Sequence, residues 1–467
     1  MFPGRMARVL CASAAFACAT SALAQFETRF SMPDKGEPQS LAVSDFNGDG
    51  YLDLAVAAHV TGQVSVLLGN GDGTFRRPVL YKAGANTVIS GDLRNIGISD
   101  LVVTNPALHA IGVMLGNGDG TFGPLTRYPD TQGNPVFAAF GDFNNDGNLD
   151  VVAVDDTACA CISVLLGNGD GTLRKQMHMT APYPAQTLGV GDFNRDGNLD
   201  VVTAGQFGGT NEMGVLLGNG DGTFRAAGSY PTFNGPQSIA VADLNGDHIP
   251  DVAIAEPEGG AISIFLGNGD GTFRAAPTIG AYFPAFVVSA DFNGDGIVDL
   301  AALTGLNSSF VSLFLGNGDG TFQPEINFPA AQAAAIATGD FNADLQVDLA
   351  LGNYLGNSVI TLLNTGVVAF SPTTALAFNK QTVGTTSAPQ IVTLTNTGKT
   401  ALTISSMKAT GQFGMTSTCG ATVAPGANCA ISVTFSPKTK GAKSGTVTIK
   451  DSASSKPMVI ELSGTGT

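Results

Sequence analysis

The stretch Asp45-Phe46-Asn47-Gly48-Asp49-Gly50-Tyr51-Leu52-Asp53 decides how the rest of the chain is interpreted. Side-chain oxygens stand at its first, third, fifth and ninth positions, and a glycine stands at its sixth. A fixed period of about 50 residues is typical of a repeat array, either a solenoid or a propeller. The stretch recurs in seven registers, 47 to 51 residues apart, which begin at Asp45, Asp92, Asp142, Asp192, Asp243, Asp291 and Asp340.

The side chains of this stretch are of the kind that calcium binds. Ca2+ takes roughly six to eight hard oxygen ligands, and a loop with carboxylate or amide oxygens at positions 1, 3 and 5 and a backbone carbonyl at position 7 resembles the first part of an EF-hand loop. The closing acid stands at position 9 rather than position 12, so the loop is shorter than an EF-hand and does not need flanking helices. We therefore predict a calcium-binding loop in six of the seven copies.

Each predicted site uses side chains at positions 1, 3, 5 and 9 and the backbone carbonyl of position 7. The predicted ligands are Asp45, Asn47, Asp49, Tyr51, Asp53; Asp142, Asn144, Asp146, Asn148, Asp150; Asp192, Asn194, Asp196, Asn198, Asp200; Asp243, Asn245, Asp247, Ile249, Asp251; Asp291, Asn293, Asp295, Ile297, Asp299; and Asp340, Asn342, Asp344, Gln346, Asp348. Copies five and seven have His248 and Leu345 at the sixth position. A non-glycine residue in a left-handed turn costs about 1 kcal/mol or more, so weaker binding is expected there.

Copy two departs from the pattern. Its third and fifth positions are Arg94 and Ile96, so two oxygen ligands are missing and we predict no calcium there. Instead, we expect the Arg94 guanidinium to lie between Asp92 and Asp100, where the cation lies in the other copies.

The segments between the loops predict four short strands per repeat. In the first copy, apolar runs at 52–57 and 64–68 follow the loop, and a glycine-rich turn then leads to a fourth segment at 74–81. The absence of any ten-residue helical pattern favours a propeller blade over a helical solenoid. The seventh copy lacks its fourth segment, whereas residues 26–32 resemble one. We therefore predict an all-β, seven-bladed propeller whose last blade is closed by the N-terminal strand, which leaves no open sheet edge.

A second motif, Leu68-Gly69-Asn70-Gly71-Asp72-Gly73-Thr74-Phe75, recurs almost unchanged at Asn117, Asn168, Asn219, Asn268 and Asn317. Asn-Gly and Asp-Gly favour tight hairpins, so we expect a turn between the third and fourth strands; a second oxygen site is the alternative. The calcium-type loops, between the first and second strands, and these hairpins then lie on one face of the propeller, which we call the calcium-loop face. The irregular face is the opposite one, with variable loops such as 129–135, 155–161, 205–214, 230–236 and 255–261. Varied loops on a rigid scaffold are where recognition usually occurs, so a ligand is expected there.

Both ends of the chain differ from the repeats. Residues 1–24 have Arg5 and Arg8, an apolar run and Ala22-Leu23-Ala24, which predict a cleaved secretory signal rather than a membrane anchor. No later segment is long enough to span a bilayer, and the expected location is secreted, extracellular or periplasmic. Residues 369–467 lose the repeat period and show alternating short strands typical of an immunoglobulin-like sandwich. The propeller is assigned to 25–368.

Charge and cysteines narrow the function further. Residues 25–369 have 36 acids against 12 Lys and Arg, a net charge of −24, which disfavours nucleic-acid binding. In an exported protein Cys419 and Cys429, on either side of an Ala-Pro-Gly-Ala turn, are expected to form a disulfide. Cys159 and Cys161 leave three states open: a local bridge, two thiols, or a metal pair, the last being least favoured.

Taken together, the loops and turns resemble a known family. The pattern Asp-Phe-Asn-x-Asp-Gly-x-x-Asp followed by Leu-Leu-Gly-Asn-Gly-Asp-Gly-Thr-Phe resembles the FG-GAP/VCBS repeats of bacterial secreted proteins, relatives of the integrin α-subunit propeller. The resemblance implies calcium in the loops and roles in adhesion, glycan binding or, occasionally, polysaccharide lysis. Asn396-Thr397-Gly398 and Thr434-Phe435-Ser436-Pro437 resemble Hydin-type or choice-of-anchor-D Ig-like domains, which implies interaction or surface attachment.

Two function classes follow. The first is a calcium-stabilised binding or adhesion protein with a glycan or protein ligand and no catalytic residues, since the sequence has no serine-hydrolase elbow, zinc-protease motif or phosphate loop. The second is a polysaccharide lyase, which needs a base on the irregular face; Tyr183, Tyr230, Tyr282 and His109 are the candidates.

Overall fold

The computed structural model describes residues 26–467 apart from 34–35, 130–132, 156–160, 182–183, 208–209, 331, 345, 365–367, 372–374, 397–400 and 452–456. The predicted signal segment 1–24, Cys159, Tyr183 and Leu345 therefore lie outside the described residues. Within them the chain is all-β, and one 3-10 turn, η1 (Pro106–Leu108), is its helical element. No helix of the described part is long and apolar enough to cross a membrane.

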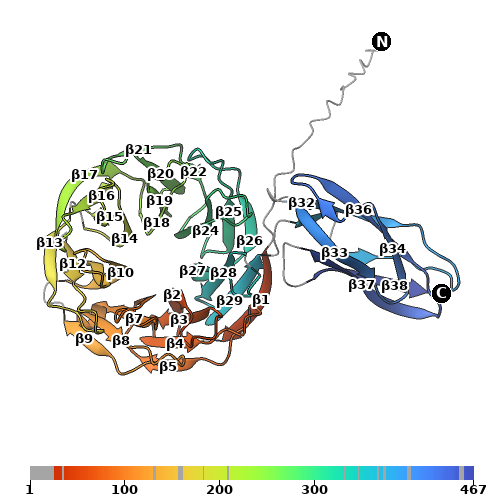
Figure 1. Ribbon diagram of the computed structural model, residues 1–467, viewed down its shortest axis with the longest axis horizontal. Coiled ribbons are helices and arrows are strands. Elements are labelled where there is room, and N and C mark those ends of the chain that lie inside the picture. The colour runs from red at the N-terminus through yellow and green to blue at the C-terminus, as the bar shows by residue number, and fades with distance from the viewer. Residues whose placement is uncertain are drawn as a thin grey trace, which may run out of the picture.

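Seven sheets, each with four main strands, are arranged in a ring in the described part of the chain (Figure 1). From the innermost strand outward, they are β2 (Pro38–Ser44), β3 (Asp53–Ala58), β4 (Gln63–Leu67), β5 (Val79–Lys82); β6 (Thr87–Gly91), β7 (Asp100–Asn105), β8 (Ala110–Met114), β9 (Thr126–Pro129); β10 (Pro135–Gly141), β11 (Asp150–Asp155), β12 (Cys161–Leu165), β13 (Met177–Thr180); β14 (Thr187–Gly191), β15 (Asp200–Phe207), β16 (Thr210–Gly218), β17 (Phe224–Pro231); β18 (Ser238–Ala242), β19 (Asp251–Glu256), β20 (Ala261–Gly267), β21 (Phe273–Ala275) with β22 (Ile279–Gly280); β23 (Phe286–Ala290), β24 (Asp299–Thr304), β25 (Phe310–Phe314), β26 (Ile326–Pro329); and β27 (Ala333–Gly339), β28 (Asp348–Asn353), β29 (Ser358–Asn364), β1 (Phe26–Pro33). We number these sheets blades one to seven in this order.

Each blade packs its middle strands against both neighbours. The second strand of blade one, β3, is buried along its whole length, and so are its counterparts β7, β11, β19, β24 and β28. A strand covered on both faces needs apolar side chains on both, so these segments read as continuous apolar runs rather than alternating ones. The resulting cores lie between blades; one of them joins Ala55 and Val66 of blade one to Val88 and Leu101 of blade two.

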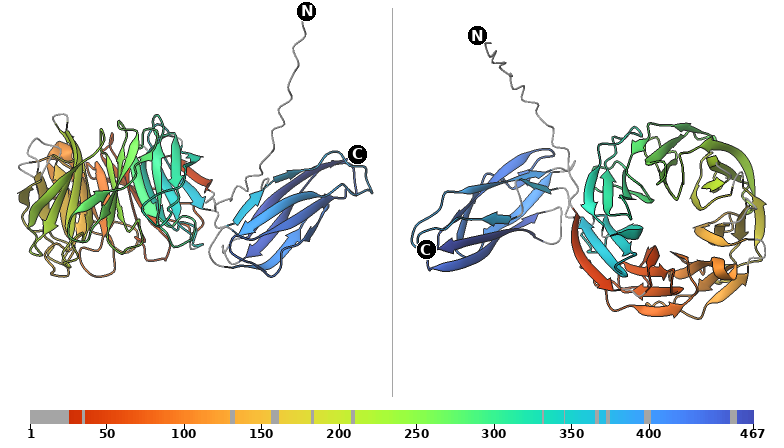
Figure 2. Two further views of the ribbon diagram at one scale, coloured as in Figure 1. Left: turned by 90° about the horizontal axis from the view of Figure 1, so that it is seen from above. Right: turned by 180° about the vertical axis from the view of Figure 1, so that it is seen from behind.

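The N-terminal strand closes the ring. β1 pairs antiparallel with β29, from Phe26 opposite Asn364 to Pro33 opposite Ser358, and so becomes the outer strand of blade seven. The Phe26 ring packs edge-on against Phe292 and Phe328 of blade six, 6.0 and 5.2 Å away between centroids. Figure 2 shows this closure from behind, where the red N-terminal strand lies beside the cyan strands of the seventh blade. The closure is the arrangement that the displaced fourth segment predicted.

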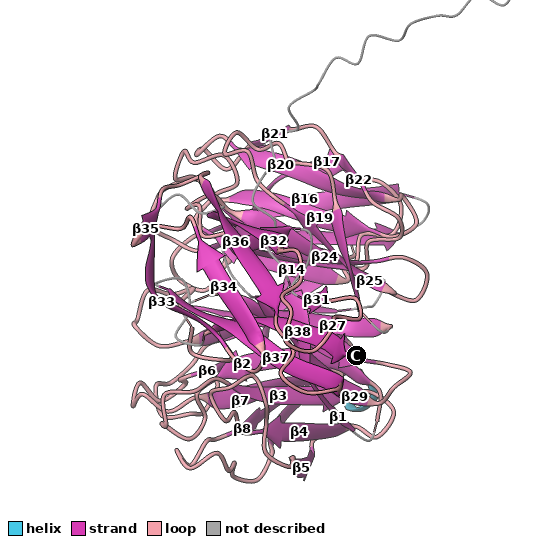
Figure 3. Cartoon of the chain, turned by 90° about the vertical axis from the view of Figure 1, so that its right-hand side faces the viewer, coloured by secondary structure: helices cyan, strands magenta, loops and turns pink. Residues whose placement is uncertain are grey.

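The C-terminal region forms two packed sheets (Figure 3). One contains β30 (Val368–Ser371), β32 (Gln390–Asn396), β36 (Asn428–Phe435) and β34 (Phe413–Ser417), and the other contains β31 (Ala375–Ala377), β38 (Met458–Gly466), β37 (Gly441–Asp451), β33 (Leu402–Ala409) and β35 (Thr422–Val423). Phe413 and Phe435 stack in the core at 4.9 Å between ring centroids. The predicted disulfide between Cys419 and Cys429 is confirmed.

Candidate metal centres and ligand-binding face

The first calcium-type loop winds around the carboxylate of Asp45. The backbone N–H of Gly48 donates to Asp45 Oδ1 at 2.7 Å, and that of Gly50 donates to Asp45 Oδ2 at 2.8 Å. Asp49 N–H donates to Asn47 Oδ1 at 2.9 Å, and Tyr51 N–H donates to Asp49 Oδ1 at 3.0 Å. Each side chain at positions 1, 3 and 5 therefore has an oxygen oriented by a backbone donor of the loop, while Asp49 Oδ2 lies 3.6 Å from the Arg76 guanidinium.

The acid at position 9 has a second role that the sequence did not reveal. Asp53 is fully buried, and it accepts the N–H of Phe46 at 2.8 Å and the N–H of Gly69 at 2.7 Å. It therefore joins the calcium-type loop to the hairpin turn of the same blade. The same pair of hydrogen bonds occurs in all seven blades, on Asp53, Asp100, Asp150, Asp200, Asp251, Asp299 and Asp348.

The electrostatics of these loops fit a bound cation. Burial raises the pKa of Asp53 to about 6, and the neighbouring carboxylates of Asp49 and Asp45 raise it further against the two backbone hydrogen bonds. Burial likewise raises the pKa of Asp299 to about 7 and that of Asp348 to about 8. Three acids that repel one another around hard oxygen donors are the donor set that a divalent cation neutralises. The residues present therefore fit calcium, which would supply a positive centre to each loop, and the assignment stays a prediction.

Blade two contains a protein-supplied positive charge instead. The Arg94 guanidinium lies 2.6 Å from Asp100 Oδ1 and donates to the Gly116 carbonyl at 2.6 Å. Asp92 accepts the backbone N–H groups of Arg94 and Gly97. The expected contact with Asp100 is thus present, whereas no ion pair joins Arg94 to Asp92 among the described residues, because the loop backbone already occupies that carboxylate.

Left-handed residues occur at two positions of the loop, and only one was expected. His248, at the sixth position of copy five, has φ +62° and still donates its N–H to Asp243 Oδ2 at 2.9 Å. The fourth position is left-handed too, at Gly48, Asn95, Asn145, Arg195, Gly246, Gly294 and Ala343. The preference for Gly or Asn at the fourth position was the available signal.

The second repeated motif is a hairpin that also links the blades. In blade one, Asp72 Oδ1 accepts the N–H of Thr74 at 3.0 Å and its hydroxyl at 2.5 Å, so the carboxylate is used within the turn. In later copies the Thr hydrogen bond holds the pKa of the matching Asp below its usual range, as at Asp119 and Asp170. These bonds favour the hairpin interpretation over a second oxygen site.

A closed ring of hydrogen bonds runs around the calcium-loop face. The glycine after each turn Asp donates its N–H to the carbonyl of position 2 in the preceding blade's loop, as Gly120 does to Phe46 at 3.0 Å. Blade seven has no such glycine, and there the side chain of Asn364 donates to the Phe292 carbonyl at 2.7 Å. The other links are Gly73 to Phe341, Gly171 to Leu93, Gly222 to Phe143, Gly271 to Phe193 and Gly320 to Leu244. Every loop is therefore tied to its neighbours.

The irregular face carries most of the exposed apolar surface of the described residues. Of fourteen exposed large apolar side chains, eight lie on its loops or their ends: Val60, Leu108, Phe233, Tyr282, Phe283, Leu306, Phe310 and Leu355. Tyr282, Phe283, Leu306 and Phe310, which we call the aromatic crest, come from adjacent loops of blades five and six. Gly305 N–H donates to the Tyr282 carbonyl at 2.6 Å, and the rings of Tyr282 and Phe283 are 5.1 Å apart.

The candidate bases for a lyase are not brought together. The Tyr230 hydroxyl accepts the N–H of Phe273 in the next blade at 2.9 Å, so it lies on β17 in a structural contact rather than on the irregular face. The prediction that Tyr230 lies on the irregular face was wrong. Tyr230 belongs to an outer strand, and its side chain reaches the neighbouring blade. His109 is exposed, with its Nδ1 3.2 Å from the Gly133 carbonyl, and Tyr282 belongs to the aromatic crest.

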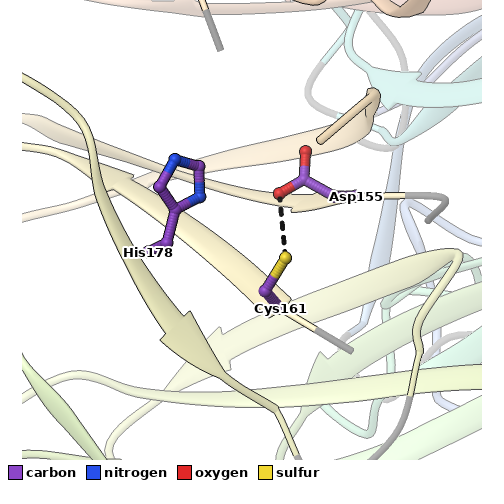
Figure 4. A group of neighbouring side chains, drawn as sticks. All are labelled: Asp155, Cys161 and His178. Carbon is purple, nitrogen blue, oxygen red and sulfur yellow. Dashed lines mark hydrogen bonds between the residues drawn. The ribbon is translucent and has the colours of Figure 1, made fainter. Parts of the chain in front are cut away.

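Asp155, Cys161 and His178 form a cluster of potential metal ligands in blade three (Figure 4). The Cys161 sulfur lies 3.9 Å from Asp155 Oδ2, but Cys161 is disulfide-bonded and so provides no thiolate. Its partner lies outside the described residues. Ser163, fully buried, donates to Asp155 Oδ2 at 2.8 Å, and Ser263 donates to Glu256 at the same place in blade five. The acid–serine pair recurs in blade five, which favours a structural contact, and in blade three His178 Nδ1 also lies 3.1 Å from Ser163 Oγ.

Comparisons with known proteins agree with this architecture. The model described as FG-GAP-like repeat matches residues 92–153, 142–203, 192–254, 243–302 and 291–351, and FG-GAP repeat matches 38–67. Residues 365–459 match the ASH domain, described as Abnormal spindle-like microcephaly-assoc'd, ASPM-SPD-2-Hydin. No curated protein matches.

Solved structures match the chain at low sequence identity. BBS1N in complex with ARL6DN is 12% identical with a TM-score of 0.53, and the match covers 73% of this chain and 97% of that one. A protein from Lactobacillus plantarum is 14% identical with a TM-score of 0.48, over 64% and 86% of the two chains. At 12% identity the first likeness supports the fold alone.

Proposed function

The chain belongs to the FG-GAP repeat family and carries a C-terminal ASH domain, and from this premise we propose that it is a calcium-stabilised binding protein. It acts outside the cytoplasm, as the signal-like segment 1–24 indicates, and it binds a glycan or protein ligand on the irregular face of the propeller. Calcium in the six loops is part of the scaffold rather than of the binding surface.

One observation carries the choice of face. Exposed apolar side chains that gather on one surface usually mark an interaction site, and aromatic residues dominate the energetics of such sites. Eight of the fourteen exposed large apolar side chains in the described residues lie on the irregular face, against two, Tyr51 and Ile96, on the calcium loops. Phe283 in the crest also has φ +50°, a backbone strain of the kind that is retained at functional sites.

The two faces of the propeller have different proposed roles, support on the calcium-loop face and ligand recognition on the irregular face. The oxygen ligands of the calcium-type loop are kept in six of the seven blades, and the loops of all seven are linked by hydrogen bonds to neighbouring blades, which suits a supporting ring. The loops of the irregular face differ in length and sequence, which suits recognition of a specific ligand. Lyase activity is the weaker hypothesis, since one of its candidate bases, Tyr230, has a structural role, His109 lies beside the Gly133 carbonyl, and Tyr282 packs against Phe283.

A glycan array and a panel of cell-surface proteins test the proposal with three chains: the unaltered protein, Tyr282→Ala/Phe283→Ala, and Val79→Ala/Leu80→Ala. Val79 and Leu80 are exposed apolar residues of β5 on the outer rim, so they control for loss of apolar surface alone. Loss of binding in the crest variant, with retention in the rim variant, supports the proposal. Binding that survives the crest change but is lost in the rim variant would place the ligand elsewhere.

A further inference from the structure

A cavity of about 580 Å³ lies at the centre of the propeller. Its walls come from the innermost strands of six blades and, in blade four, from Gln186 just before β14, at the ends that open toward the irregular face. The volume is within the roughly 300–1,000 Å³ range of small-ligand sites. Apolar residues such as Leu41, Ile89 and Ile239 alternate along the wall with Ser40, Thr87 and Ser238.

Four side-chain amides lie at the mouth of this cavity. Gln39, Asn86, Gln186 and Gln237 each stand six residues before the first Asp of their blade's loop, so the repeat places them at equivalent points on the ring. Asn86 is engaged, since its Oδ1 lies 2.9 Å from His59 Nδ1. The side-chain amides of Gln39, Gln186 and Gln237 make no hydrogen bond to another described residue, and those of Gln186 and Gln237 are exposed.

The cavity has no charge of its own. None of the described residues that line it is Asp, Glu, Lys, Arg or His. The same innermost strands lead, at their other ends, into the acids that begin the calcium-type loops, such as Asp45 and Asp192. A charged group would therefore lose its water here without gaining a counter-ion, which is costly. An anion would in addition face an acidic domain.

We propose that this cavity binds the end of an uncharged saccharide chain. The inference rests on the proposed function and specifies its ligand class. Each glutamine amide offers two donors and one acceptor oxygen, which matches hydroxyl groups that both donate and accept. Gln39 of blade one faces the cavity from a different side than Gln186 and Gln237 of blades four and five, so one ligand can be held from both sides.

The wall favours a sugar over a peptide for the same reason. A sugar ring presents hydroxyls around its edge and C–H groups on its faces, and the cavity presents amides at its mouth and Leu, Ile and Val along its walls. An extended peptide pairs with a long strand edge, whereas each blade lines this cavity with at most four consecutive residues.

Calorimetric titration of the full chain with neutral tetrasaccharides of glucose, mannose and N-acetylglucosamine, and with tetragalacturonate as the charged match, tests the proposal. The variants are Gln39→Ala/Gln186→Ala/Gln237→Ala and, as control, Gln323→Ala, a glutamine after the blade-six hairpin outside the cavity. We expect a neutral probe to bind, the triple variant to weaken it about ten-fold or more, and Gln323→Ala to change it by less than about two-fold.

Three results would overturn the proposal: tighter binding of tetragalacturonate than of every neutral probe, unchanged binding by the triple variant, or no neutral probe binding at millimolar concentration. The crest variant Tyr282→Ala/Phe283→Ala distinguishes failure of the cavity proposal from failure of the proposed function. If that variant loses its ligand while the triple glutamine variant keeps it, the irregular face remains the binding face and the cavity proposal falls. If both variants keep it, both proposals fall.

Discussion

Replacing Arg94 with alanine should destabilise blade two whether or not calcium is present. The guanidinium lies 2.6 Å from Asp100 Oδ1 and 2.6 Å from the Gly116 carbonyl, and Asp100 is fully buried. Without Arg94 the Asp100 carboxylate keeps, among the described residues, only the N–H groups of Leu93 and Gly116 as partners. A buried charge without its counter-charge then opposes folding.

The size of the effect follows from this geometry. Removing one partner of a buried ion pair costs roughly 3–5 kcal/mol, and the 20% exposure of the Arg94 side chain reduces the expected loss to about 2–4 kcal/mol. In a domain of this size, that loss should lower the melting temperature by about 3–8 °C. Arg225→Ala, which removes an exposed arginine of β17, is the matched control and should change stability by less than about 0.5 kcal/mol.

The assay is thermal unfolding by calorimetry, with excess chelator in one series and excess calcium in the other. Arg94→Ala should lie below the unaltered protein by the same margin in both series. The double change Arg94→Asn/Ile96→Asp restores oxygen ligands at the third and fifth positions, so its stability should be low in chelator and recover in calcium. If Arg94→Ala is as stable as the unaltered protein in chelator, or if calcium rescues it as fully as the double variant, the counter-ion reasoning is wrong.

Three further perturbations test other parts of the molecule. Chelation should lower the melting temperature of the propeller, and Asp49→Ala should do so partly because it impairs one loop of six; unchanged melting on chelation would contradict the calcium assignment. Burial raises the pKa of Glu256 to about 7, so its ionisation opposes folding: between about pH 4.5 and 7 stability should fall with rising pH by up to about 3 kcal/mol, and Glu256→Gln measured in excess calcium should flatten that slope. Cys419→Ser/Cys429→Ser, which opens a loop with a sequence separation of 10, should destabilise the sandwich by about 2–3 kcal/mol in chemical denaturation and leave the propeller transition in place.

Much of the fold could be predicted because the same pattern of loops and strand segments recurs in seven copies along the sequence. The period, the four strand segments and the displaced fourth segment at 26–32 were enough to predict the β1–β29 pairing. A departure from a repeat was as informative as the repeat itself. Arg94 replaced an oxygen ligand beside Asp100, and opposite charges in one short loop have few other ways to be satisfied.

Contacts between blades could not be predicted in this way. The bond from Asn364 to Phe292 joins residues 72 positions apart, and nothing local in either segment specifies it. Tyr230 was assigned to the variable loop 230–236, yet it lies on β17 and its hydroxyl reaches the backbone of Phe273. Exposure is equally non-local, since whether Phe283 or Phe310 is covered depends on loops from other strands.

In the function proposed above, the calcium-type loops would affect binding without contacting the ligand. The ring of hydrogen bonds passes from each loop to the next, so an ion that tightens one loop restrains the strands on both sides of it. The innermost strands connect that ring to the cavity, where Gln39, Gln186 and Gln237 are held at fixed separations only while the seven blades keep their arrangement. Left-handed residues of the irregular face, such as Phe283 and Asn307, also persist only where the surroundings hold them. If the proposed calcium and ligand both bind, a cation on one face would contribute to recognition on the other by keeping the ligand-binding groups pre-organised.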